Sequence, residues 1–161
     1  TMNPEIKEFL TEADDPVGCE WPGGRYSSEA WQTCDTSVRM IQDALAQQMH
    51  LHLLRDGNVQ DASFFDDLFV LAEEQQTKRD EGASYALAYR ICVRFSNFGQ
   101  LFTVFPTPLP AEYDPDQIIR IVSAHGWRYV SADDLDVPYD GRNRTLRQSN
   151  ITWWIRFFDY L

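Results

Sequence analysis

Residues 85–105, YALAYRICVRFSNFGQLFTVF, decide the fold. Large apolar side chains occupy every second position from Tyr85 to Phe95, and small or arginine residues fill the positions between them. Such an alternation predicts a β-strand that buries one of its faces. Residues 96–99 supply a turn, and residues 100–105 return as a second strand. The segment therefore predicts an antiparallel β-hairpin.

Helical periodicity precedes this hairpin. In residues 28–55, apolar side chains recur at spacings of three, four and seven, which places them on one face of a long helix. Residues 61–79 carry a second, broad apolar face, with Asp66 and Asp67 on its outer side. Because the connection between these two segments is short, we expect an antiparallel helical hairpin.

One helix and two strands are expected after the hairpin. Residues 115–125 have an aspartate as N-cap, proline at the first helical position and glycine after the end, which together predict a helix. Residues 127–131 and 151–160 have the composition of strands, and a polar loop over residues 132–149 separates them. The last strand is aromatic on both faces, which is typical either of a central, doubly covered strand or of an exposed binding surface.

These elements predict one domain of the α+β class over residues 1–161. Their order is α-α-β-β-α-β-β: a helical hairpin, then a small, mostly antiparallel four-stranded sheet with one further helix. The length fits a single domain. Residues 1–26 are expected to be largely irregular, apart from a short helix over residues 4–12.

The charge is acidic and unevenly distributed. The net charge is −11, and residues 1–82 hold 17 acidic and 6 basic side chains, whereas residues 83–161 hold 8 of each. A field of this sign repels nucleic acid and anionic membranes, because contact with phosphate requires lysine and arginine. It attracts a basic protein. The plainer alternative is that the acidity only keeps the chain soluble.

The cysteines and the start of the chain predict a cytoplasmic location. Cys19, Cys34 and Cys92 are odd in number and lack CxxC spacing, which argues against a disulfide scaffold and for a reducing compartment. The first residues show no signal-peptide pattern, and no apolar run is long enough to span a bilayer. We expect no membrane partner.

Catalytic and metal-binding motifs are not recognisable. His50 and His52 are two positions apart on the predicted helix and point to different sides, whereas a helical zinc pair needs a spacing of three or four. His125 at a helix end is explained by the helix dipole. The sequence contains no phosphate loop, GxSxG or HExxH pattern. We therefore expect no cofactor and no metal, and a binding protein rather than an enzyme.

Candidate partner-binding residues come from three segments. The polar loop contributes four aspartates followed by arginines, and long loops often carry recognition; exposed charges that pair within the loop are the plainer alternative. The last strand contributes residue types that supply much interface energy. The second predicted helix contributes its outer acids. The candidates are Asp133, Asp134, Asp136, Asp140, Arg142, Arg144, Trp154, Arg156, Tyr160, Asp66 and Asp67.

Three functions are compatible with this sequence. The first is a small protein-binding module, such as an inhibitor, an immunity protein or an antitoxin, for a basic partner. The second is a small enzyme or ligand-binding domain in which carboxylates such as Asp133, Asp134 or Asp159 meet His125 or Cys92 across a cleft. The third is self-association through the last strand or the helical hairpin. None of them includes nucleic-acid binding.

Overall fold

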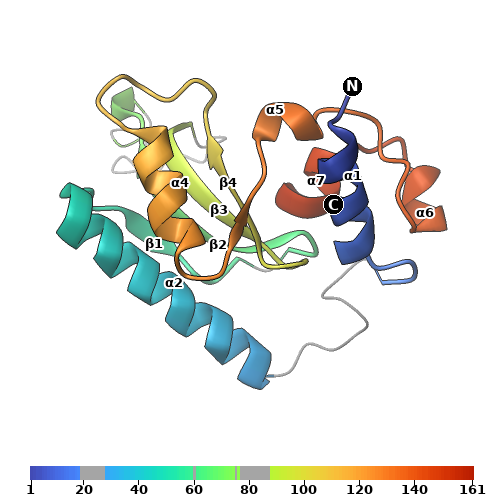
Figure 1. Ribbon diagram of the computed structural model, residues 1–161, viewed down its shortest axis with the longest axis horizontal. Coiled ribbons are helices and arrows are strands. Elements are labelled where there is room, and N and C mark those ends of the chain that lie inside the picture. Colours follow the sequence, from blue (N-terminus) through green and yellow to red (C-terminus); the bar gives the residue numbers. More distant parts are fainter. Residues whose placement is uncertain (19–27, 60, 75, 77–87) are drawn as a thin grey trace.

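A five-stranded sheet lies at the centre of the computed structural model, which describes residues 1–18, 28–59, 61–74, 76 and 88–161 (Figure 1). Neighbouring strands are antiparallel, except that β5 runs parallel to β4. The strands, in spatial order, are β1 Leu54–Asp56, β2 Phe64–Leu71, β3 Tyr89–Ser96, β4 Leu101–Phe105 and β5 Arg128–Tyr129. The predicted α+β class with a mostly antiparallel sheet is confirmed.

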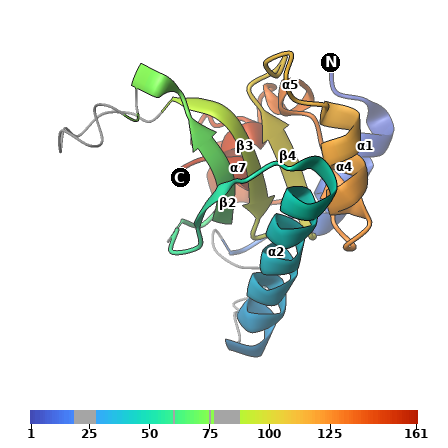
Figure 2. The same cartoon turned by 90° about the vertical axis from the view of Figure 1, so that its left-hand side faces the viewer.

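Helices cover both faces of this sheet (Figures 1 and 2). α2 (Ser28–Met49) and α4 (Pro115–Ser123) lie on one face. α7 (Trp153–Phe158) lies on the other, where the Ser63 hydroxyl donates to the Ile155 carbonyl at 2.8 Å. The other helices beside α7 are α1 Pro4–Ala13, α5 Ala132–Leu135 and α6 Arg144–Arg147. We call α1, α5, α6 and α7 together the α7 cluster.

Two apolar clusters account for most of the buried core. The larger one fills the space between the sheet and the α2 and α4 helices, with Ile41 and Leu45 of α2 packed toward Phe95 and Phe102. The second joins the two ends of the chain. It contains Leu10 of α1, Leu135 of α5, Leu146 of α6, and Trp153 and Phe157 of α7. The α7 cluster is therefore held by its own apolar core.

Several predicted elements are confirmed. The β3–β4 hairpin is present, with residues 85–87 of the predicted strand outside the described part of the chain. α4 begins as expected: the Asp114 carboxylate accepts from the Gln117 amide at 3.1 Å, and Pro115 occupies the first turn. A short helix near the start is also confirmed. Of the segment expected to be irregular, residues 19–26 lie outside the described residues.

The predicted helix over residues 61–79 is wrong. Residues 64–71 form β2, a central strand that pairs with β1 and β3, and all but one of its residues are buried. A strand covered on both faces lacks the polar alternation that identifies a strand in sequence, so its apolar run resembles a helix. The preceding helix also ends at Met49 rather than residue 55, and β1 follows it. The helical hairpin is thus replaced by a helix and two strands.

The predicted last strand is also wrong, because residues 153–158 form α7. The Thr152 hydroxyl caps this helix by accepting from the Ile155 amide at 3.2 Å. The aromatic residues that we predicted on two faces of a strand instead form pairs four positions apart on a helix. Trp153, for example, stacks on Phe157 with ring centroids 5.9 Å apart. The polar loop before α7 is not structureless, since it contains α5 and α6.

Candidate functional site

Asp14 is the centre of a buried polar network at the base of the α7 cluster. It follows α1 directly and is 3% exposed. Its Oδ1 accepts from Nε of Arg156 at 2.8 Å, and its Oδ2 accepts from the Tyr139 hydroxyl and from the Arg142 backbone amide, the latter at 2.8 Å. Both members of the Asp14–Arg156 ion pair have fully buried side chains. One carboxylate thus joins the end of α1 to the loop before α6 and to α7.

The remaining polar groups of the network are also satisfied. Nη2 of Arg156 donates to the Gly18 carbonyl at 3.0 Å, and its guanidinium lies 4.1 Å from the centre of the Phe98 ring. The Asn143 amide donates to the Tyr139 oxygen at 2.9 Å. Burial and the bond to Asp14 raise the pKa of Tyr139 above its ordinary value, so this hydroxyl remains a donor. Because buried charges are tolerated only when well paired, this network fixes the surrounding loops.

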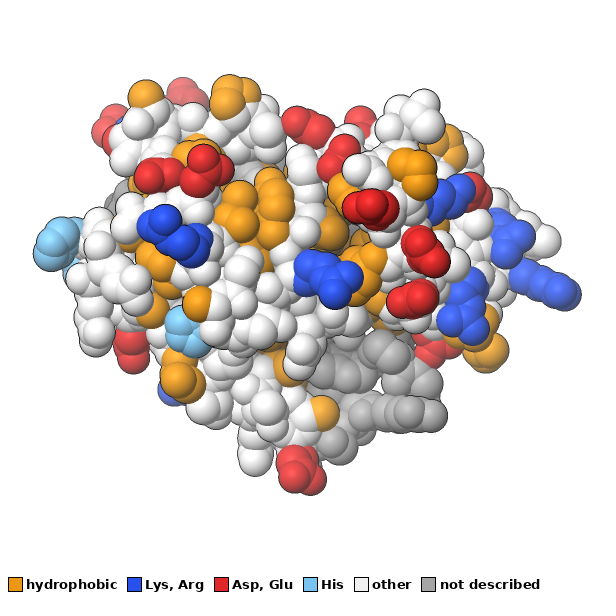
Figure 3. Space-filling view, in the orientation of Figure 1, with side chains coloured by type: hydrophobic (Ala, Val, Ile, Leu, Met, Phe, Trp, Pro, Cys, Tyr) orange, Lys and Arg blue, Asp and Glu red, His pale blue; other side chains and the backbone are white. Residues whose placement is uncertain are grey.

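An acidic surface covers the outer side of α1 and α5. Glu5, Glu8 and Glu12 are spaced by three and four residues, so they share one exposed face of α1. Both helices contribute leucines to the same apolar cluster, and Figure 3 shows acidic side chains gathered over the two of them. The six carboxylates that we call the acidic face are those of Glu5, Glu8, Glu12, Asp133, Asp134 and Asp136.

The carboxylates of the acidic face have no ion-pair partner within the described residues. The one lysine of α1, Lys7, pairs with Asp140 in the loop before α6. Asp133 and Asp136 are exposed, and Asp134 is half-buried. Like charges three and four positions apart on one helix repel one another, and a cation from a partner would relieve that repulsion.

Asp66 and Asp67 lie in the interior, which corrects the expectation that they face solvent. Arg94 donates to Asp67 in a two-pronged contact, with Nε–Oδ1 and Nη2–Oδ2 both at 2.8 Å. Its third nitrogen donates to the Phe158 carbonyl at 2.7 Å, which ties the sheet to α7. Asp66 pairs with Arg55. Burial raises the pKa of Asp66 to about 6, more than the Arg55 guanidinium lowers it.

The structure divides the predicted contact residues into two groups. Asp66, Asp67 and Arg156 are buried and hold the fold, so they leave the set of surface candidates. Trp154 is half-buried, and its indole donates to Asp159 at 3.0 Å. The loop residues and Tyr160 remain accessible. Asp133, Asp136, Asp140, Arg142, Arg144 and Tyr160 are exposed, and Asp134 is partly so.

Sequence reasoning missed the acids of α1 and the Asp14 network. The glutamates of α1 were visible in principle, since their spacing of three and four residues marks one helical face. The network had no such signal. Asp14 and Arg156 are 142 positions apart, and Tyr139 lies in a loop between them in the fold.

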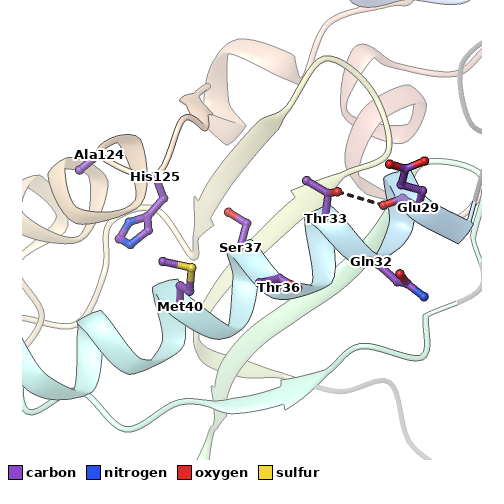
Figure 4. A pocket seen from close by; sticks show the side chains of 8 residues that line it. All are labelled: Glu29, Gln32, Thr33, Thr36, Ser37, Met40, Ala124 and His125. Atoms are coloured by element: carbon purple, nitrogen blue, oxygen red, sulfur yellow. Dashed lines mark hydrogen bonds between the residues drawn. The ribbon is translucent and has the colours of Figure 1, made fainter.

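His125 and Cys92, two groups that could serve an enzyme, lie in different parts of the described structure. His125 lines an open groove of about 630 Å³ between α2 and α4, and its Nδ1 lies 2.9 Å from the Ile121 carbonyl (Figure 4). Glu29 lies at the far end of that groove. Cys92 is fully buried, and burial raises the pKa of its thiol well above the ordinary value. These groups therefore occupy separate places.

Metal-ligand clusters and membrane-spanning helices are absent from the described residues. No group of three or more His, Cys, Asp or Glu side chains is placed to hold a metal ion there. None of the helices described is both long enough and apolar enough to cross a membrane. No family model, no curated protein and no solved structure matches this chain.

Proposed function

We propose that this protein is a binding module for a basic protein partner, of the inhibitor, immunity or antitoxin type, and that the acidic face is its contact surface. One observation supports the proposal above others. The fold brings together carboxylates from α1 and from α5, two segments more than a hundred positions apart, and pairs none of the six within the described residues. Such a surface complements a cluster of lysines and arginines.

The electrostatic arrangement carries a cost to folding. Glu8 and Glu12 are four positions apart on α1, a spacing at which like charges destabilise a helix by about 0.2–0.5 kcal/mol. The lysines and arginines of a basic partner would attract these carboxylates and offset their mutual repulsion. Complementary charge of this kind chiefly raises the association rate. The acidic excess of the chain works in the same direction at longer range.

The acidic face is also rigid, which favours recognition. α1 is anchored by Leu10 in the apolar cluster and by Asp14 in the polar network, and α5 is anchored by the fully buried Leu135. Because buried contacts fix both helices, their carboxylates need little further ordering when a partner binds. Preorganisation of this kind lowers the entropic cost of association.

A pull-down with paired variants tests the proposal. The bait is the wild-type chain, the variant Glu8→Gln/Asp133→Asn, or the control Glu29→Gln/Asp43→Asn. The control removes the same charge from exposed positions of α2, one in its first turn and one within the helix. Extract of the source cell is applied at low and at high salt, and retained proteins are identified by mass spectrometry.

The expected result is a basic protein that is retained at low salt by the wild type and the control, and is depleted with the α1/α5 variant. Two exposed charge contacts of about 0.2–1 kcal/mol each correspond to a loss of affinity of about twofold to thirtyfold. Equal retention by the variant and the control would overturn the assignment to this face. Retention of no basic protein by any bait would overturn the proposed function.

A further inference from the structure

A cavity of about 560 Å³ opens beside α6 and is lined by arginines. Arg142, Arg144 and Arg147 surround it, together with Thr145 and the exposed turn after α1, Pro16 and Val17. Three arginines around one cavity are unexpected in a chain of net charge −11. We call this cavity the arginine pocket.

The positive charge of the arginine pocket is not compensated within the described residues. Among the described residues, no carboxylate forms an ion pair with Arg142, Arg144 or Arg147. Three carboxylates around the pocket have other partners: Asp140 pairs with Lys7, Asp14 pairs with Arg156, and Oδ1 of Asp15 accepts from the Val17 and Gly18 amides at 2.8 Å. The sequence also allowed the aspartates and arginines of this loop to pair with one another. Among the described residues, they do not.

The pocket stands on the rigid network below it. Asp14 holds the backbone of Arg142, and the Asn143 side chain accepts from the Leu146 amide at 3.1 Å to cap α6. Gly141 packs so closely on the network that an added Cβ would lie 2.6 Å from Oδ2 of Asp14. Nε of Arg147 donates to the Gly141 carbonyl at 2.5 Å. The arginines thus project from a fixed loop, so that binding a ligand orders little of the chain.

We propose that the arginine pocket binds a small, multiply charged oxyanion, a compound that carries a phosphoryl group or adjacent carboxylates. Guanidinium groups form paired hydrogen bonds to phosphate and carboxylate oxygens. Three of them match a ligand with at least two negative charges, and the Thr145 hydroxyl adds a donor. Val17 is 87% exposed and gives the pocket an apolar wall for the organic part of the ligand.

Calorimetric titration of the full chain tests this inference, with pyrophosphate and citrate as probes and sodium chloride at matched ionic strength as the blank. The variants are Arg144→Ala and Arg147→Ala. The control is Arg120→Ala, which removes another exposed arginine, from α4 and outside the pocket. Thermal unfolding of each variant checks that the fold is retained.

We expect saturable binding with one ligand per chain, at least tenfold weaker in each pocket variant and unchanged in the control, because charged hydrogen bonds are lost. Tighter binding of pyrophosphate identifies a phosphoryl ligand, and tighter binding of citrate identifies a polycarboxylate. The inference is overturned if neither probe saturates at millimolar concentration, or if Arg120→Ala weakens binding as much as the pocket variants do. The result is independent of the proposed basic partner, because the acidic face contributes no residue to the pocket.

Discussion

Replacing Asp14 by asparagine removes the charge at the centre of the buried network while keeping the size of the side chain. Arg156 then loses the ion pair with Asp14 while its side chain stays fully buried, and the hydrogen bonds from Tyr139 and from the Arg142 amide lose their charged acceptor. Breaking a buried ion pair in this way costs about 3–5 kcal/mol. In a domain of this size each kcal/mol lowers the melting temperature by about 2–4 °C, so Asp14→Asn should lower it by roughly 6–20 °C.

Thermal and urea unfolding, followed by tryptophan fluorescence and circular dichroism, measure this effect. The matched control is Asp43→Asn on the exposed side of α2, which should stay within about 0.5 kcal/mol of the wild type. The double variant Asp14→Asn/Arg156→Met removes both charges but keeps an acceptor oxygen at position 14 for Tyr139 and the Arg142 amide, so it should recover part of the loss. A melting temperature lowered by less than about 2 °C in Asp14→Asn would refute the reasoning, as would a double variant less stable than the single one.

Three further predictions follow from buried groups. Burial raises the pKa of Asp66 to about 6 in the folded state, above its value in the unfolded chain. The contribution of Asp66 to the free energy of unfolding therefore falls by up to about 3 kcal/mol as pH rises from about 4 to about 6. Urea unfolding across this pH window should show the fall in the wild type relative to Asp66→Asn, and parallel curves for the two proteins would contradict it. Cys92 should resist iodoacetamide until the chain unfolds, because its thiol is buried and protonated; peptide mapping that finds it alkylated in the native protein would disprove this. Gly141→Ala should destabilise the protein by about 1–3 kcal/mol, because the added methyl group overlaps Asp14 and Tyr139; an unchanged urea midpoint would exclude that overlap.

The parts of the fold that carry a local signal were predictable from the sequence. The hairpin of β3 and β4 follows from alternation, and α4 follows from its cap, its proline and its glycine. β2 carries no such signal, because a strand buried on both faces lacks polar alternation. α7 was predicted as a strand because it has only six residues. In so short a segment, aromatic residues four positions apart on a helix also fit the alternating pattern of a strand.

In the candidate site too, features set by neighbouring residues were predictable, and contacts between distant segments were not. The charges of the loop before α7 were recognised, but their relation to α1 depends on the packing of the two chain ends in one apolar cluster. Asp66 and Asp67 looked like surface acids because their segment was taken for a helix, and only strand pairing places them beside Arg55 and Arg94. Asp14 and Arg156 meet across almost the whole length of the chain.

The association rate of the basic partner, measured against ionic strength, tests the central claim most directly. Stopped-flow or surface-based kinetics would compare the wild type, Glu8→Gln/Asp133→Asn and the control Glu29→Gln/Asp43→Asn. If the acidic face guides the partner, the rate falls with added salt, is lower for the α1/α5 variant than for the control, and leaves the dissociation rate little changed. An association rate that is insensitive to salt, or the same in the variant and the control, would contradict the account.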